Sequence, residues 1–136
     1  MQRAWIALFL LTGASAQAPA TMKQLMLDLI HPASNEILVF VNRGEPKTEQ
    51  DWAAVRRSAL TLEESGDLLV APARSRDGDW SQDARALASV GAAAYKAAQA
   101  KDLPALSALA DSLDSSCTNC HKQYRPNVFP REGASK

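Results

Sequence analysis

Apolar residues recur every three or four positions along most of this chain, and this spacing predicts helices. Each apolar stretch begins at or just after a Thr or Asp, residues that commonly cap the N-termini of helices. No alternating pattern of the kind that predicts strands is visible. The sequence therefore predicts an all-α protein with four helices, over residues 21–43, 48–71, 80–100 and 102–124.

The first of these stretches contains His31-Pro32 near its middle. A proline inside a helix lacks the N–H that would bond to the preceding turn, so it bends or breaks the helix. The apolar period resumes in phase beyond it, at Ala33 and Ile37, which predicts one bent helix. Four amphipathic helices with short links are typical of an antiparallel up-down-up-down four-helix bundle.

The first 16 residues predict an export signal. Arg3 is followed by an apolar run, residues 4–11, and then by Ala-Ser-Ala at 14–16, which matches the pattern of a cleavage site. The run is shorter than the roughly 20 residues that span a bilayer, which weighs against the alternative, an uncleaved membrane anchor. We therefore expect a signal peptide over residues 1–16 that is cleaved near Ala16. The rest, residues 17–136, is expected to be one periplasmic domain without stable membrane insertion.

The charge balance argues against a nucleic-acid partner. The chain has 15 Lys and Arg against 15 Asp and Glu, and loss of Arg3 with the signal leaves 14 basic against 15 acidic residues. Domains that bind nucleic acids carry a strongly basic face.

The two cysteines of the chain lie near its C-terminus, in the sequence Cys117-Thr118-Asn119-Cys120-His121. This C-x-x-C-H spacing is that of covalent haem c attachment, with a thioether from each cysteine to a vinyl group and the histidine as iron ligand. On a helix the three side chains share one face. Two alternatives use the same cysteines. A thiol–disulfide pair is typical of a βαβ context, and a zinc site needs a fourth ligand.

The predicted signal, the helices and this motif together resemble class II c-type cytochromes, the family of cytochrome c′ and of low-spin relatives such as cytochrome c556. The residues that carry the resemblance are Cys117, Cys120, His121, Tyr124 and Arg125, which fit C-x-x-C-H-x-x-[FY]-R. The resemblance implies a bundle that encloses haem c and passes single electrons to redox partner proteins of the periplasm, without enzymatic chemistry. Some relatives dimerise through their first two helices, so a homodimer is compatible with it.

The resemblance also implies a role for Arg125. The family carries an arginine near the proximal histidine and the haem propionates, and Arg125 occupies that place in the motif. The alternative is a cation that interacts with the C-terminal dipole of the last helix.

The residue at the sixth iron position is predicted from the heights that residues of neighbouring helices share along the bundle axis. In an antiparallel bundle the end of the last helix, with His121, lies level with the start of the first helix, near residue 25. Met26 lies there on the apolar stripe, and low-spin class II relatives carry a methionine ligand on this helix. We therefore predict Met26 as sixth ligand, with core filling as the alternative. A vacant sixth position, as in cytochrome c′, would instead give a protein that binds NO or CO.

His31 is expected away from the iron. An α-helix turns by about 100° per residue, which places His31 roughly 140° around the helix from Met26, at the proline bend and partly solvated. The same levels predict the residues that surround the haem: Leu25, Leu29, Ile30, Gly66, Leu69, Trp80, Ala84, Leu87, Leu113 and Tyr124.

Overall fold

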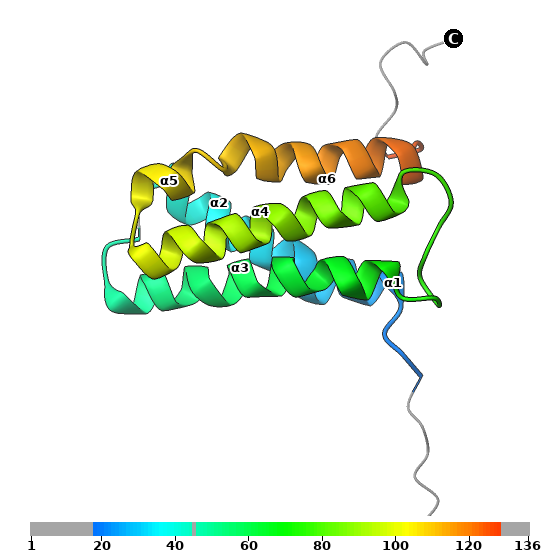
Figure 1. Cartoon of the computed structure of the whole chain (residues 1–136), viewed down its shortest axis with the longest axis horizontal. Coiled ribbons are helices and arrows are strands. Elements are labelled where there is room, and N and C mark those ends of the chain that lie inside the picture. Colours follow the sequence, from blue (N-terminus) through cyan, green and yellow to red (C-terminus); the bar gives the residue numbers. More distant parts are fainter. Residues whose placement is uncertain (1–17, 45, 129–136) are drawn as a thin grey trace, which may run out of the picture.

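The computed structural model describes residues 18–44 and 46–128, and within these ranges it is helical and contains no strand. Four helical stretches run alternately up and down along one axis (Figure 1), as predicted. The predicted signal peptide, residues 1–16, lies outside the described residues. The first stretch consists of α1 (Met22–Gln24), η1 (Leu25–Ile30) and α2 (His31–Asn42), the second of α3 (Glu49–Val70), the third of α4 (Trp80–Ala100), and the fourth of α5 (Leu103–Ser107) and α6 (Ala110–Tyr124).

The first stretch begins and ends where local side-chain chemistry predicts. The hydroxyl of Thr21 accepts a hydrogen bond from the backbone N–H of Gln24 at 3.3 Å, and the Gln24 side chain accepts one from the backbone N–H of Thr21 at 2.9 Å. This reciprocal pair satisfies two donors at the helix start. At the other end Gly44 has φ +66°, a left-handed conformation that glycine adopts without a steric penalty.

The middle of the first stretch departs from α-helical geometry. From Leu25 to Ile30 the backbone forms a π-helix, whose hydrogen bonds join residues five apart, and the N–H of His31 donates to the carbonyl of Met26. Pro32 explains the wider turn, because it has no N–H and its ring crowds the carbonyl of Asp28, four residues earlier. The helix continues past Pro32, as predicted, but by widening a turn.

The helices α3 and α4 approach each other most closely at two glycines. A Cβ at Gly91 would lie 2.4 Å from the backbone N of Glu63, and a Cβ at Gly66 would lie 2.7 Å from the Cβ of Ala88. Both distances are too short for a real side chain. The absence of a side chain at these positions therefore sets how closely α4 packs on α3.

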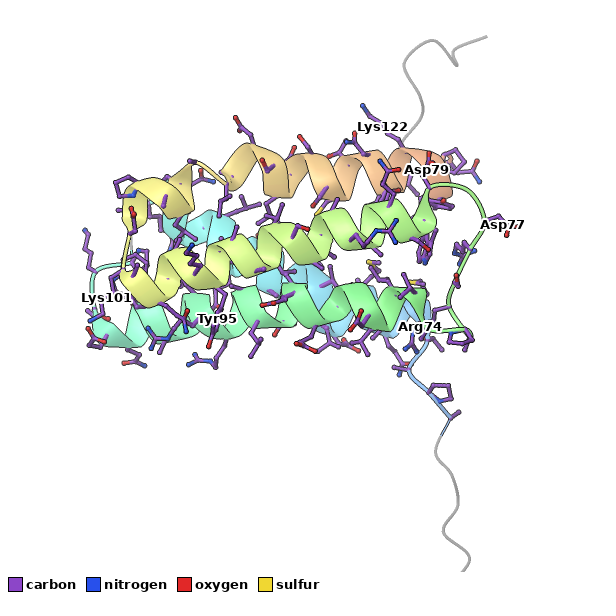
Figure 2. All side chains as sticks on the ribbon, viewed as in Figure 1. Arg74, Asp77, Asp79, Tyr95, Lys101 and Lys122 are labelled. Carbon is purple, nitrogen blue, oxygen red and sulfur yellow. The ribbon has the colours of Figure 1, made fainter. Side chains whose placement is uncertain are left out.

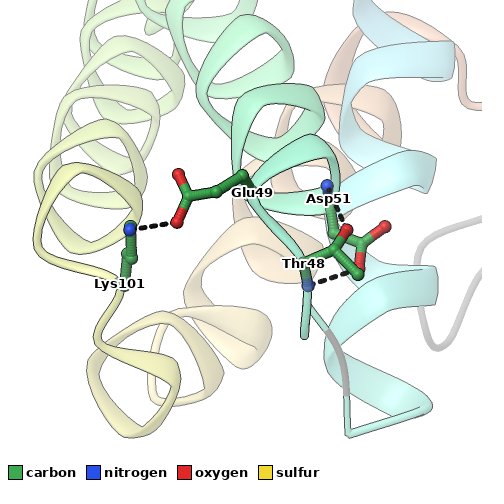
Figure 3. Close-up of polar contacts among 4 residues, drawn as sticks. All are labelled: Thr48, Glu49, Asp51 and Lys101. Atoms are coloured by element: carbon green, nitrogen blue, oxygen red, sulfur yellow. Dashed lines mark hydrogen bonds and ion pairs between the residues drawn. The ribbon is translucent and has the colours of Figure 1, made fainter.

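The end of the bundle near the start of α3 is held by polar contacts (Figure 3). Thr48 and Asp51 form the predicted capping box, with the Thr48 N–H donating to the Asp51 carboxylate at 2.8 Å and the Asp51 N–H donating to the Thr48 hydroxyl at 3.1 Å. Glu49 forms an ion pair with Lys101, which lies just after α4 and has φ +53°. These contacts join the start of α3 to the end of α4.

The fourth stretch is not the single helix that the sequence predicts. Asp102 caps it, accepting from the N–H of Ala105 at 2.9 Å, but α5 ends after one turn and a half. At the junction the N–H of Leu109 donates to the carbonyl of Leu106, three residues earlier, at 3.1 Å. This tighter turn interrupts the α-helical pattern, and α6 restarts at Ala110.

The core is built from the predicted apolar stripes. Val55, Leu62, Leu106 and Leu113 are each at most 1% exposed, and they come from the second and the fourth stretch. No helix in residues 18–44 or 46–128 has the length and apolar character needed to cross a membrane.

Candidate functional site

A cavity of about 390 Å³ lies between the first helical stretch, α4 and α6. Its interior is mainly apolar, with Ile30, Leu69 and Leu87 among the residues that line it. Asp114 and Arg125 also line the cavity, and both residues are exposed, so they lie where the cavity meets solvent. A cavity of this size and apolar character is typical of a site for an organic cofactor.

One wall of the cavity carries the C-x-x-C-H motif. Cys117, Cys120 and His121 all line it, and all three lie within α6. Their spacing of three and four residues therefore brings the side chains to one face of a helix, as the sequence predicts. The two cysteines are free thiols and are partly buried.

Burial changes the proton affinity of all three groups. It raises the pKa of the Cys117 thiol, and together with the negative charge of Asp83 it raises the pKa of the Cys120 thiol to about 11. Burial lowers the pKa of His121, and the nearby Arg125 guanidinium lowers it further. At neutral pH the cysteines are thus thiols, and the imidazole is neutral, which is the form that binds metals. Thiol–disulfide exchange instead requires a lowered cysteine pKa.

The wall contributed by the first helical stretch carries Met26, as predicted, and also His31. His31 is exposed beside Pro32, as expected, but it lines the same cavity as Met26, which the expected rotation of about 140° does not predict. That angle assumed α-helical spacing, in which residues four apart stack on one another. In the π-helical turn the bonded residues are five apart, and these two residues are the bonded pair. Met22, one turn earlier, packs against the core and does not line the cavity.

Two aromatic rings pack against each other where the α3–α4 loop meets the end of α6. Trp80 lines the cavity, and its indole N–H donates to the carbonyl of Leu69 at 2.9 Å. The ring of Tyr124 packs edge-on against it, with centroids 4.8 Å apart. The Tyr124 hydroxyl donates to the carbonyl of Asp77 at 2.7 Å, and Figure 2 shows Asp77 on the loop beside the end of α6. The tyrosine of the motif therefore fastens this loop to α6.

The α3–α4 loop also carries two arginines. Arg74 donates to the carbonyls of Leu68, at 2.6 Å, and Ala20, at 3.1 Å, and thereby ties the loop to the chain before α1. The guanidinium of Arg76 lies 5.5 Å from the centre of the Trp80 ring, within the range of a cation–π interaction. With Arg125, it places a second cation beside the motif, and its charge offsets a small part of the rise in the pKa of Cys120.

Asp83 is a polar residue of the cavity that the sequence did not predict. Its Oδ2 is buried and has no hydrogen-bond partner among the described residues. Burial raises the pKa of this carboxyl, and the neighbouring Asp79 raises it further. The sequence offers one hint of this placement, since Asp83 lies one turn before Leu87 and therefore on the inner face of α4. Acidic residues are usually solvated, which is why Asp83 was not predicted to line a cavity.

The predicted surroundings of the cofactor are met in part. Ile30, Leu69, Trp80, Ala84 and Leu87 line the cavity. The other five predicted residues do not: Leu25 and Leu113 lie in the core, Gly66 packs on α4, Tyr124 packs on Trp80, and Leu29 is 39% exposed. The π-helical turn accounts for Leu29, because it rotates that residue out of the α-helical stripe.

The part of the chain that the structure describes contains no group of three or more His, Cys, Asp or Glu side chains placed to hold a metal ion. The zinc alternative therefore finds no ligand set in these residues, since structural zinc takes four ligands. Comparisons of the chain with family models, with curated proteins and with solved structures found no match.

Proposed function

We propose that this chain is an exported carrier of single electrons whose redox group is a haem c, held covalently by Cys117 and Cys120 with His121 as proximal ligand. The observation that supports it best is that these three side chains share one wall of a mainly apolar cavity. Two thiols and one imidazole at this spacing match two thioether bonds and one axial nitrogen.

The residues of the cavity suit this cofactor in three ways. Each thiol would add across one vinyl group of the porphyrin, with its sulfur bonding to one vinyl carbon and its hydrogen passing to the other. The lowered pKa keeps His121 neutral at neutral pH, and the neutral imidazole is the form that binds metals. Leu69, Ala84 and Leu87 give the cavity apolar walls, and burial in such surroundings is one of the factors that set a haem potential.

Bound haem c would supply the redox chemistry by cycling between ferric and ferrous iron. In this proposal Met26 is the sixth ligand, and Arg125 at the rim binds a propionate through a charge-assisted hydrogen bond. The resemblance to class II cytochromes, the predicted signal peptide and the predicted redox partners of the periplasm belong to the same proposal. The alternative, a five-coordinate protein that binds NO or CO, is less well supported because the distal wall offers Met26 as a ligand.

The test is expression with export in a host that attaches haem c, followed by acid–acetone extraction and intact mass measurement. We expect the haem to stay on the polypeptide, and to be lost when Cys117 and Cys120 are both replaced by Ala. Ser115→Ala is the matched control, because Ser115 is exposed on the same helix and does not line the cavity. Recovery of the wild-type chain with two free thiols and no haem would overturn the proposal.

A second measurement tests the proximal ligand. Replacing His121 by Ala keeps both cysteines, so we expect covalent haem with an altered ligand-field spectrum. A spectrum identical to that of the wild type would show that another residue is the proximal ligand.

A further inference from the structure

The wall of the cavity formed by the first helical stretch presents two side chains that bind iron. Met26 offers a thioether and His31 an imidazole, and both line the cavity that the motif lines from α6. Among the described residues, no hydrogen bond or ion pair to the His31 ring is present, and the residue is exposed. Its imidazole is therefore not committed to a structural contact.

The backbone holds these two residues together. The N–H of His31 donates to the carbonyl of Met26 across the π-helical turn, so that one residue lies a turn above the other on the cavity side. The hydroxyl of Ser34 donates to the carbonyl of His31 at 3.0 Å, and Ser34 itself is buried. The backbone bond and the Ser34 hydroxyl bond thus hold the backbone of His31 on both sides, and both residues line the cavity.

We propose that His31 is a second distal ligand, which binds the iron of this protein in place of Met26. This inference rests on the proposed function, since it requires the haem. An axial thioether raises the potential of a haem, which means that it favours ferrous iron. Imidazole favours the ferric state by comparison, so oxidation shifts the ligand population toward His31 and reduction shifts it toward Met26.

The decisive experiment compares Met26→Leu with the double variant Met26→Leu/His31→Ala, both as purified proteins with attached haem. We expect ferric Met26→Leu to remain low-spin, with the near-infrared magnetic circular dichroism of bis-histidine haem and a lower reduction potential than the wild type. The double variant is expected to become high-spin, and its ferrous form to bind CO readily. High-spin iron in Met26→Leu itself would overturn the proposal, as would a double variant that keeps the bis-histidine signature.

The single variant His31→Ala tests the redox preference. We expect it to remove any bis-histidine component from the ferric spectrum, to leave the ferrous spectrum unchanged, and to raise the reduction potential. An unchanged potential together with an unchanged ferric spectrum would show that His31 takes no part in wild-type ligation and would overturn the proposal.

Met22→Leu is the matched control, because Met22 lies in the same helical stretch and packs on the core without lining the cavity. Its spectra should match those of the wild type.

The failure of this proposal differs from failure of the proposed function. If no variant retains haem after acid–acetone extraction, covalent attachment has failed, whereas retained haem with a high-spin Met26→Leu variant refutes His31 alone.

Discussion

Replacing Gly91 by Ala should destabilise the fold through the contact between α3 and α4. The new Cβ would lie 2.4 Å from the backbone N of Glu63 and 2.9 Å from the carbonyl oxygen of Ala59. Ordinary van der Waals contact begins at 3.4 Å, so the two helices must separate by roughly 1 Å. Both clashing atoms belong to the backbone of α3, so no side-chain rotation relieves the contact.

The size of the effect follows from two opposing contributions. Overpacking costs about 1–3 kcal/mol, and a backbone clash belongs near the upper value. Alanine gains about 1 kcal/mol over glycine in helix propensity. The free energy of unfolding should therefore fall by about 2 kcal/mol. Urea denaturation followed by circular dichroism measures this change, with an unchanged denaturant slope if the variant still unfolds in two states.

The control is Ala86→Gly, at an exposed position of the same helix, which should lose about 1 kcal/mol from helix propensity alone. It calibrates the propensity contribution in α4. A Gly91→Ala variant that is as stable as the wild type, or more stable, would refute the close approach of α3 and α4 at this point.

Two further predictions concern the partly buried carboxyl of Asp83 and the left-handed backbone of Lys101. Burial raises the pKa of Asp83 above its ordinary 3.8. The folded protein therefore keeps the carboxyl proton at pH values where the unfolded chain has lost it. As a result, the free energy of unfolding falls as the pH rises from 3.8 through the raised pKa. Asp83→Asn should be more stable than the wild type at neutral pH and show a weaker pH dependence in thermal unfolding between acid and neutral pH; equal pH profiles would contradict this. Lys101 adopts φ +53° after α4, so Lys101→Gly should gain about 1 kcal/mol in urea denaturation. Lys101→Ala keeps the positive φ and loses the ion pair with Glu49, and it should show no gain; stabilisation of both variants alike would remove the backbone explanation.

Helix starts and stops were predictable because they depend on neighbouring residues. Thr21 and Thr48 cap their helices with side chains three residues away, and Gly44 takes the left-handed conformation that ends α2. In each case the interacting groups are within one turn, so the sequence names both partners. The break between α5 and α6 has no such signal, because Ser107, Ala108 and Leu109 are all acceptable in a helix.

Burial of individual residues was harder to predict than helix position. Asp83 lies on the inner face of α4, where its placement depends on how α4 and α6 pack. Leu29 occupies an apolar position of the predicted stripe and is nevertheless 39% exposed. A prediction of burial from hydrophobic periodicity assumes α-helical geometry along the whole helix. A single wider turn therefore rotates the residues that it contains away from their predicted positions around the helix.

The two sides of the candidate site differ in how far the sequence predicts them. The proximal side is contained in five consecutive residues, and any α-helix through Cys117–His121 brings its three functional groups to one face. The distal side depends on a backbone irregularity and on packing across the whole length of the chain. Pro32 predicts an irregularity in the helix, but it does not predict whether the helix bends, breaks or forms a wider turn. Because the turn widens, the N–H of His31 bonds to the carbonyl of Met26, and both residues line the cavity. Thus the proposed attachment of haem rests on local sequence, whereas the proposed choice between two sixth ligands rests on one backbone hydrogen bond that the sequence does not predict.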